Sequence, residues 1–432
     1  MIGDVIGPRL LVGLATLPVI AVPAVLPDPP EPTTTTTTST STSVRATTST
    51  ASTTSTVSTM TTSTALPPST TSPSTTSTTT TTLPSRLVIP PAMWARFDEL
   101  IAGQLTGRGD RAAGVAVAVD GYVVHAAAFG TRTPDDPLDV VTTSDRFRIA
   151  SISKLVTATV VLQLVDAGLL RLDEPVGQRL ADVAGVTPGN GVPGVTVRQL
   201  LSHTSGLPDY RGQFFGDAFT SCEQAAAFGL SRSLAHQPGT EHDYSNLNFC
   251  LLGLLIADAT GKPYEAAVTD LLLRPLGISG MRLVATIDPD PDEVVHLSGA
   301  SRTYMQSLGG AGGWVGTPTD LVRILDALDP ASPGWHPLPP ALATLMHQAL
   351  DVSYPEPSER RYGLGTVVWP DGSWGHTGTV ENTHTMLARR PDGMTWCILV
   401  SGDVPESTEA LREVFDRALG QSGIAFTGAG RG

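Results

Sequence analysis

Lysine is almost missing from this chain of 432 residues. Lys154 and Lys262 are its two lysines, although lysine and arginine together number 27. Arginine keeps its proton at any accessible pH, whereas a lysine in a desolvated pocket can release one and act as a base. A chain that uses arginine for nearly every cation therefore makes each lysine a candidate for chemistry that arginine cannot perform.

Positive charge and metal-binding motifs are scarce as well. The 41 acidic side chains leave a formal net charge of −14, which argues against nucleic acid or an anionic membrane as a partner. The nine histidines include no His-Glu-x-x-His motif and no His/Cys cluster of zinc spacing. We expect neither a metal ion nor another cofactor.

Cysteine is limited to three positions, Cys222, Cys250 and Cys397. Cys397 lies in an apolar run and is expected to be a buried thiol. Cys222 and Cys250 either close a local disulfide, which export would permit, or remain separate thiols. Spacing along the chain does not decide between the two.

The first fifth of the chain lacks the residues that build a core. Residues 33–82 are almost entirely Thr and Ser with scattered Pro, and Arg45 is their single charge. Such a tract buries too little apolar surface to offset its ordering entropy. Residues 27–85 are therefore predicted to form a disordered stalk, of the kind that carries O-linked sugars on exported proteins.

An apolar run of 17 residues, 10–26, precedes this tract. Pro18 and Pro23 interrupt it, and it is short for a membrane span, so residues 1–26 indicate a secretory signal peptide, with an uncleaved anchor as the alternative. Both interpretations place the rest of the protein outside the cytoplasm, secreted or attached to the cell envelope.

Residues 86–424 have the composition of one folded domain, followed by a flexible tail, 425–432. Helical spacing of apolar residues, β-prone runs and Asp-Gly turns predict strands at both ends of this domain and helices between them. The expected strands are 114–119, 122–126, 362–369, 374–379, 385–388 and 395–400, and the clearest expected helices are 94–105, 155–167, 247–257 and 406–419. The predicted fold class is α/β (α+β), an antiparallel sheet flanked by helices with an inserted helical subdomain at about 170–300.

Three short motifs carry candidate chemistry: Ser151-x-x-Lys154, Tyr244-Ser245-Asn246 and His376-Thr377-Gly378-Thr379. A spacing of three places a hydroxyl and an amine on the same helical turn, where the amine can deprotonate the hydroxyl. Each motif alone also has a structural interpretation: a helix cap beside a solvated lysine, a core tyrosine, and an edge-strand histidine.

In this order, the three motifs resemble those of the penicillin-recognising serine hydrolases, especially the group of D-alanyl-D-alanine carboxypeptidases, class C β-lactamases and related esterases. The surrounding stretches 147–150, 200–208, 251–255, 260–264, 311–313 and 362–365 are similar to that family too. The resemblance covers about residues 90–420 and implies a β-lactamase/transpeptidase-like fold. Lys262 is then a lysine in a surface turn.

The resemblance implies a role for each motif residue. Ser151 is the expected nucleophile, Lys154 the base that activates it, and Tyr244 the group that passes a proton to the leaving group. Asn246 is expected to hydrogen-bond the acyl side of the substrate.

The strand motif is expected to hold the rest of the substrate. The backbone N–H groups of Ser151 and Thr379 would form the oxyanion hole. His376, with the Thr377 and Thr379 hydroxyls beside Gly378, would bind the substrate's polar or carboxylate end. β-Lactamases of this group usually have lysine in place of His376, so we expect anionic substrates to bind better as the pH falls through a histidine pKa near ~6.5.

The implied activity is that of an exported serine hydrolase with an acyl-enzyme mechanism, most similar to D-alanyl-D-alanine carboxypeptidases that act on peptidoglycan peptides. An esterase or a β-lactamase of the same family is the alternative. Two other classes are a protein that binds peptidoglycan without turnover and a stalked adhesin. The expected partner is a small-molecule or peptide substrate and not nucleic acid. Association with the cell envelope is compatible with the sequence, and the expected oligomeric state is a monomer.

Overall fold

The computed structural model describes residues 84, 87–108, 111–134, 136–296, 302–354, 359–405 and 407–426, all in the unit Thr78–Gly432. The expected signal segment lies outside these ranges, and so does the stalk except for Pro84. Of the expected tail, Ala425 and Phe426 are described. Within the described ranges, none of the helices combines the length and apolar character that a membrane crossing requires.

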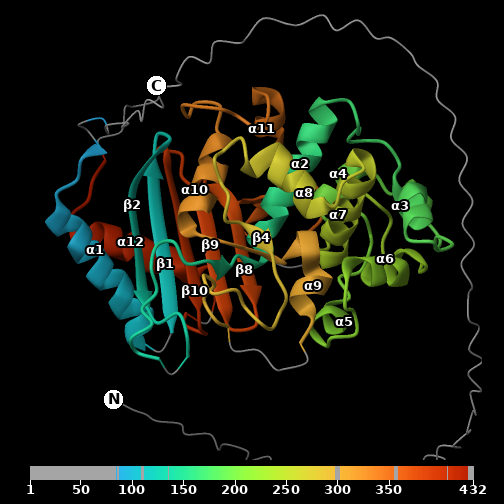
Figure 1. Cartoon of the computed structure of the whole chain (residues 1–432). Helices are drawn as coiled ribbons and strands as arrows, with labels where there is room; N and C mark the ends of the chain where they lie inside the picture. The colour runs from blue at the N-terminus through green and yellow to red at the C-terminus, as the bar shows by residue number, and fades with distance from the viewer. Residues whose placement is uncertain are drawn as a thin grey trace, which may run out of the picture. The chain divides into compact units, whose positions relative to one another are not determined.

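The strands are concentrated toward the two ends of the folded part (Figure 1). They are β1 (Ala112–Val119), β2 (Tyr122–Gly130), β3 (Phe147–Arg148), β4 (Arg282–Leu283), β5 (Trp314–Gly316), β6 (Arg361–Tyr362), β7 (Val367–Val368), β8 (Trp374–Val380), β9 (Thr383–Arg389) and β10 (Met394–Ser401).

The helices are α1 (Pro91–Gln104), α2 (Ser153–Asp166), α3 (Gly177–Val183), α4 (Val197–Leu201), α5 (Arg211–Phe215), α6 (Cys222–Leu230), α7 (Asn246–Thr260), α8 (Tyr264–Val268), α9 (Tyr304–Leu308), α10 (Pro318–Ala327), α11 (Pro340–Met346) and α12 (Ala410–Ser422). α1 precedes β1 and α12 follows β10, and the other helices lie between β2 and β6. Short helical turns are η2 (Thr106–Arg108), η3 (Ala150–Ile152), η4 (Val192–Gly194), η5 (Thr269–Leu273) and η6 (Gly309–Ala311).

The main sheet joins the two ends of the folded part. Among the described residues, its seven strands follow the order β2-β1-β10-β9-β8-β7-β6, and the neighbouring pairs are antiparallel. β1 and β2 form the expected hairpin, in which Asp120 and Gly121 adopt positive φ angles of 49° and 85°. The predicted antiparallel sheet built from both ends of the domain is confirmed.

Alternate residues of the central strands serve two separate hydrophobic cores. Val117 and Trp396 face the core that contains Phe97 of α1 and Phe415 of α12, with the two phenylalanine rings 5.7 Å apart. Ala116, Cys397 and their neighbours of the same parity face the second core. Figure 1 shows α1 and α12 together beside the sheet, and α10 and the remaining helices beyond it. The expectation that Cys397 is a buried thiol is confirmed.

The second core extends into a helical subdomain inserted between α2 and β5. Helices α3 to α9 belong to it, and α7 crosses its centre with contacts to α2, α4 and α6. A small sheet in the order β3-β5-β4 lies where the subdomain rejoins the main body. This places the segment that follows β3, the start of α7 and strand β8 around one region.

The strand predicted for 362–369 is wrong, because the chain forms β6 and β7 with a tight turn between them. Gly365 has φ +76°, and a Cβ there would lie 2.3 Å from the Cβ of Ala158 in α2. The turn is therefore pressed against the helix that follows Ser151. The last helix also begins later than predicted, at Ala410.

We predict that Gly365→Ala destabilises the protein more than Gly168→Ala. Both glycines have a positive φ, but a Cβ at Gly168 meets nothing within 4 Å. Gly168→Ala should cost about 1 kcal/mol of unfolding free energy for the left-handed conformation, and Gly365→Ala about 3 kcal/mol because overpacking adds to it. Urea unfolding measures both. Equal losses would contradict the close packing of this turn on α2.

Candidate active site

Ser151 lies on a strained turn between β3 and α2. It belongs to the short turn η3, and the preceding residue, Ala150, has a φ of +48°, which side chains with a Cβ rarely adopt. α2 begins two residues later, at Ser153. The hydroxyl is thereby presented just before the helix that carries Lys154.

Lys154 is fully buried and is held by three polar groups. Its Nζ lies 3.1 Å from Ser151 Oγ, 2.8 Å from Asn246 Oδ1 and 2.8 Å from the carbonyl oxygen of Ala311. The predicted proximity of hydroxyl and amine is present. The Tyr244 ring covers the same amine, with its centroid 4.8 Å from Nζ.

The acceptors around the amine determine where its lone pair points. Asn246 Oδ1 and the Ala311 carbonyl can only accept hydrogen bonds, so a neutral amine donates its two hydrogens to them. The lone pair then faces Ser151 Oγ, and the serine hydroxyl can donate its proton to it. Lys154 is thus arranged to accept a proton from Ser151 without changing its other two contacts.

Desolvation makes this proton transfer possible near neutral pH. The pKa of Lys154 is lowered from 10.5 to about 7, mainly by burial; the charge of Asp209 opposes this decrease and the charge of Arg211 contributes to it. Burial raises the pKa of Tyr244 above its ordinary value, although a hydrogen bond with the Ser151 side chain opposes this. At pH 7, the tyrosine is a neutral phenol and the lysine is the group that exchanges protons.

Asn246 is oriented by a carboxylate that the sequence analysis did not single out. Asp209 Oδ1 accepts hydrogen bonds from the Asn246 backbone N–H at 2.6 Å and from Nδ2 at 2.9 Å. Because Nδ2 must face this carboxylate, Oδ1 faces Lys154. The side chain of Asn246, at the start of α7 and 4% exposed, therefore supports the amine from behind the catalytic surface.

The stretch around His203 positions Tyr244. The His203 ring lies 4.3 Å from the Tyr244 ring, and its Nδ1 accepts hydrogen bonds from the Ser245 backbone N–H and from Asn248. Burial lowers the pKa of His203 well below its ordinary value, so the ring is neutral and can accept at Nδ1. These contacts give the stretch a structural role beside Tyr244.

Strand β8 approaches the backbone of Ser151 closely. A Cβ on Gly378 would lie 2.8 Å from Ser151 N and 2.7 Å from the Ala150 Cβ, so glycine is required for this approach. β7 pairs with β8 only at Trp374 and Gly375, which leaves the following residues unpaired on that edge. The strand therefore brings backbone groups and the exposed Thr379 beside the serine.

His376 differs from its expected behaviour. It is 2% exposed, and burial lowers its pKa to about 3, with the charge of Lys154 acting in the same direction. Its Nδ1 lies 2.5 Å from the Thr377 carbonyl oxygen, so Nδ1 carries the hydrogen and Nε2 accepts from the Tyr362 hydroxyl at 2.9 Å. The expectation that His376 gains charge near pH 6.5 is wrong, because the imidazole is buried and both its nitrogens are engaged.

A cavity of about 470 Å³ opens onto these residues. The predicted residues Ser151, Tyr244 and the whole His376–Thr379 motif line it, while Lys154 and Asn246 support it from behind. The cavity wall also includes Arg211, His242, Asp243, Tyr354, Arg360, Arg361, Tyr362, Val367 and Thr408. The structure thus gathers all of the predicted motifs around one cavity.

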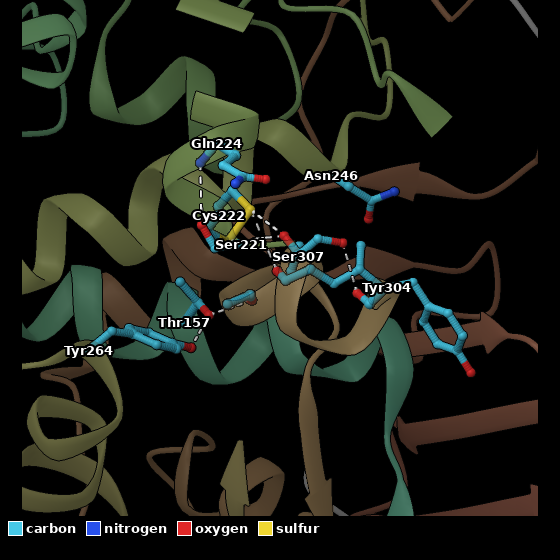
Figure 2. The surroundings of a disulfide bond; sticks show 12 residues. Thr157, Ser221, Cys222, Gln224, Asn246, Tyr264, Tyr304 and Ser307 are labelled. Atoms are coloured by element: carbon cyan, nitrogen blue, oxygen red, sulfur yellow. Dashed lines mark hydrogen bonds between the residues drawn. A yellow bond between two sulfur atoms is a disulfide. The ribbon is translucent and has the colours of Figure 1, made fainter. Parts of the chain in front are cut away.

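The disulfide between Cys222 and Cys250 is present, with the two Cα atoms 5.3 Å apart, and joins α6 to α7. Figure 2 shows Ser307 of α9 beside the bridge, where its carbonyl oxygen lies 3.3 Å from one sulfur and 3.1 Å from the other. η6, which supplies the Ala311 carbonyl to Lys154, follows α9 directly. The bridge therefore supports two of the three contacts of the amine, through α7 and through α9.

A second set of contacts holds η6 from the opposite side. The Thr157 hydroxyl donates to the Gly310 carbonyl at 2.7 Å and accepts from Tyr264, whose hydroxyl in turn accepts from Trp314 Nε1. Figure 2 shows Thr157 and Tyr264 together beneath the bridge. The position of the Ala311 carbonyl is thus set from α2, α8 and α9 together.

Comparison with known proteins identifies the family. The beta-lactamase family model matches residues 97–421. The chain belongs to the beta-lactamase family. The curated relatives include a protein named as a carboxypeptidase, and the family relationship makes this protein a serine hydrolase with a β-lactamase/transpeptidase-like fold.

Two curated relatives are 30% and 33% identical to this chain over their aligned segments. The D-alanyl-D-alanine-carboxypeptidase/endopeptidase AmpH of Escherichia coli is 33% identical over 231 residues, which are 50% of this chain and 57% of AmpH. The chain thus spans little more than half the length of that relative. Penicillin-binding protein 4 of Amycolatopsis lactamdurans is 30% identical over 339 residues, 71% of this chain and 86% of that protein.

Solved structures share the fold. SurE with D-Leu superimposes with a TM-score of 0.62 at 28% identity, over 77% of this chain and 75% of SurE. The D-amino acid amidase of Ochrobactrum anthropi has a TM-score of 0.62 at 24% identity, over 75% of this chain and 97% of the amidase, and supports the fold alone.

Sequence reasoning missed the residues that hold the motifs in place. Asp209, Arg211 and Tyr362 stand outside the Ser-x-x-Lys, Tyr-x-Asn and His-Thr-Gly patterns, although 362–365 was recognised as family-like. An acidic and a basic residue close together after the His203–Pro208 stretch were the available signal. The sequence alone does not indicate that Asp209 accepts hydrogen bonds from Asn246, which is 37 residues away.

We predict that acylation of Ser151 requires neutral Lys154. Since the base must be unprotonated, kcat/KM should rise with pH through about 7, the pKa of Lys154, and level off above it. Lys154→Arg should lower kcat/KM about 10²- to 10⁴-fold, because arginine does not release its proton in this range. Stopped-flow acylation at pH 5–9 measures both effects.

Lys262→Arg is the matched control for this experiment. Lys262 is exposed and pairs with Asp270 on the surface, so its replacement should leave the profile unchanged. Equal tolerance of arginine at both positions, or a flat profile between pH 6 and 8, would contradict the role of Lys154.

We predict that loss of the Cys222–Cys250 bridge weakens both folding and acylation. The bridge closes a loop with a sequence separation of 28, so Cys222→Ser/Cys250→Ser should cost about 3 kcal/mol of unfolding free energy. Acylation should slow as well, because η6 and α7 lose a shared support. Urea unfolding and acylation rates measure the two effects. Denatured, unreduced protein should contain one titratable thiol, Cys397, and three thiols would contradict the bridge.

Proposed function

We propose that this protein hydrolyses acyl substrates through a Ser151 acyl-enzyme and that its substrates are peptides ending in D-alanine. The observation that carries the proposal is the position of Lys154 Nζ, 3.1 Å from Ser151 Oγ. The two hydrogens of the neutral amine are donated to Asn246 Oδ1 and to the Ala311 carbonyl oxygen. A pKa of about 7 gives that amine the proton affinity that a base needs at neutral pH.

Acylation follows from these positions. Lys154 accepts the Ser151 proton as Oγ attacks the substrate carbonyl carbon, and the carbonyl oxygen takes up negative charge. When the bond to the leaving amine breaks, Tyr244 donates its phenolic proton to the amine nitrogen, and the Lys154 ammonium returns a proton to the phenolate. The net result is an ester at Ser151, a free amine and a neutral lysine.

Deacylation reverses the proton path with water in place of the amine. Tyr244 accepts a proton from the attacking water as it passes its own phenolic proton to Lys154. When the ester bond breaks, the Lys154 ammonium returns a proton to Ser151 Oγ. The backbone N–H groups of Ser151 and Thr379 are the proposed oxyanion donors, and the approach of Gly378 to Ser151 supports this assignment. In comparable acyl transfers, one such donor contributes about 3–4 kcal/mol.

At the leaving-group end of the cavity, His376 is neutral and provides no positive charge, whereas Thr377 and Thr379 provide hydroxyl groups. We assign recognition of this end to the side chains of Thr377 and Thr379, and we assign to His376 the positioning of Tyr362 through Nε2. The choice of D-alanine peptides is supported by the relative AmpH, which is named as a D-alanyl-D-alanine-carboxypeptidase/endopeptidase.

Export to the cell envelope is part of the proposal. The sequence of residues 1–26 and the Thr/Ser tract support it, and so does a disulfide, which persists in oxidising compartments. The monomeric state stays a prediction, since a family relative of the same fold from Pyrococcus abyssi is described as octameric.

Hydrolysis of esters or amides without a free carboxylate is the second candidate function. The observation that favours it is the neutral, buried His376, which provides no cation for a carboxylate. The two candidates differ in the leaving group and share the acyl-enzyme.

We predict a covalent adduct on Ser151. Intact-mass spectrometry after incubation with a fluorescent penicillin or an activated D-alanyl ester should show one added acyl group, and Ser151→Ala should show none. An adduct that survives Ser151→Ala, or its absence with each of these donors, would refute the mechanism. Steady-state kcat/KM on a D-alanyl-D-alanine peptide, a p-nitrophenyl ester and nitrocefin then ranks the leaving groups.

A further inference from the structure

Arg211 is an exposed cation in the wall of the catalytic cavity. It opens the short helix α5, and it lines the same cavity as Ser151 and Tyr244. Its guanidinium group lies 4.9 Å from the centre of the Phe215 ring, which holds the stem of the side chain against the helix. No carboxylate among the described residues forms an ion pair with Arg211.

Two other ionisable groups in the cavity wall have close partners. Arg360 pairs with Glu409, and Asp243 lies 3.4 Å from His236. The protein as a whole is strongly acidic, with a net charge of −14, so an anionic substrate is repelled at long range. The Arg211 guanidinium group, in the wall of the cavity that Ser151 also lines, offsets that repulsion where the substrate binds.

Arg211 is placed on the acyl side by its position at the start of α5, two residues after Asp209. Its charge lowers the pKa values of Lys154, Tyr244 and Asp209, and Asp209 is the carboxylate that holds Asn246. The charge of Arg360 also lowers the pKa of Tyr244, and it lowers those of His376 and His242 as well.

We propose that Arg211 is a specificity-determining residue that binds a carboxylate on the acyl portion of the substrate. The inference rests on the proposed function, since the acyl portion is the part that Ser151 retains. A guanidinium group suits a carboxylate because its planar donors match the two oxygens. The enzyme then prefers acyl donors that carry a negative charge before the cleaved bond.

The test compares two substrates that differ in one charge, Nα-succinyl- and Nα-succinamoyl-D-alanyl-D-alanine. The wild-type enzyme should show about tenfold higher kcat/KM for the succinyl peptide at low salt, mainly through KM. The preference should shrink as ionic strength rises, because salt screens an exposed contact. Arg211→Gln should abolish the preference, and Arg211→Glu should reverse it.

Arg232→Gln is the matched control. Arg232 is also exposed, its guanidinium group lies over the Phe228 ring at 3.4 Å, and it belongs to the same subdomain outside the cavity. It should keep the wild-type preference. An unchanged preference in Arg211→Gln, or an equal loss in Arg232→Gln, overturns the assignment.

A binding experiment separates this inference from the proposed function. Ser151→Ala cannot form the acyl-enzyme, so calorimetry with Nα-succinyl-D-alanine and Nα-succinamoyl-D-alanine reports recognition without turnover. Tighter binding of the succinyl compound, lost in Ser151→Ala/Arg211→Gln, supports Arg211 even if wild-type hydrolysis is absent. Equal binding of both compounds overturns the role of Arg211 while an acyl adduct on Ser151 would still support the proposed function.

Discussion

The buried amine of Lys154 is the point on which the rest of the structure depends. A lysine with no exposed surface is costly unless its hydrogen bonds are satisfied, and here three segments satisfy them. α7 brings Asn246, η6 brings the Ala311 carbonyl, and the turn before α2 brings Ser151. The burial that destabilises the charged amine also lowers its pKa to about 7, so the amine can exchange a proton with Ser151 near neutral pH.

Much of the helical subdomain can be understood as support for that amine. The Cys222–Cys250 bridge lies beside the α9 residue Ser307, and Thr157 holds η6 from α2. Asp209 fixes the orientation of Asn246, so that its amide oxygen and not its nitrogen meets the lysine. These contacts explain why residues far apart in the chain, and outside the catalytic motifs, bear on the chemistry of Ser151.

Sequence and structure agree where the interaction is local. The β1–β2 hairpin follows from Asp120-Gly121, and the proximity of Ser151 to Lys154 follows from a spacing of three. They disagree at His376, whose unperturbed pKa was a fair expectation for an isolated imidazole. Burial and two hydrogen bonds, to Tyr362 and to the Thr377 carbonyl, keep it neutral instead. The turn at Gly365 also escaped prediction, because its cause is contact with α2 and not local propensity.

The sequence by itself determined the kinds of group at the site and the family to which they point, because nucleophile, base and phenol are fixed by residue type and short spacing. It also determined the antiparallel sheet, through alternating β-prone runs and turns. Only the tertiary structure decided which cysteines pair, which way the Lys154 lone pair faces, and which arginines reach the cavity. Those properties depend on burial and on neighbours supplied by distant segments, and no local pattern of residues encodes them.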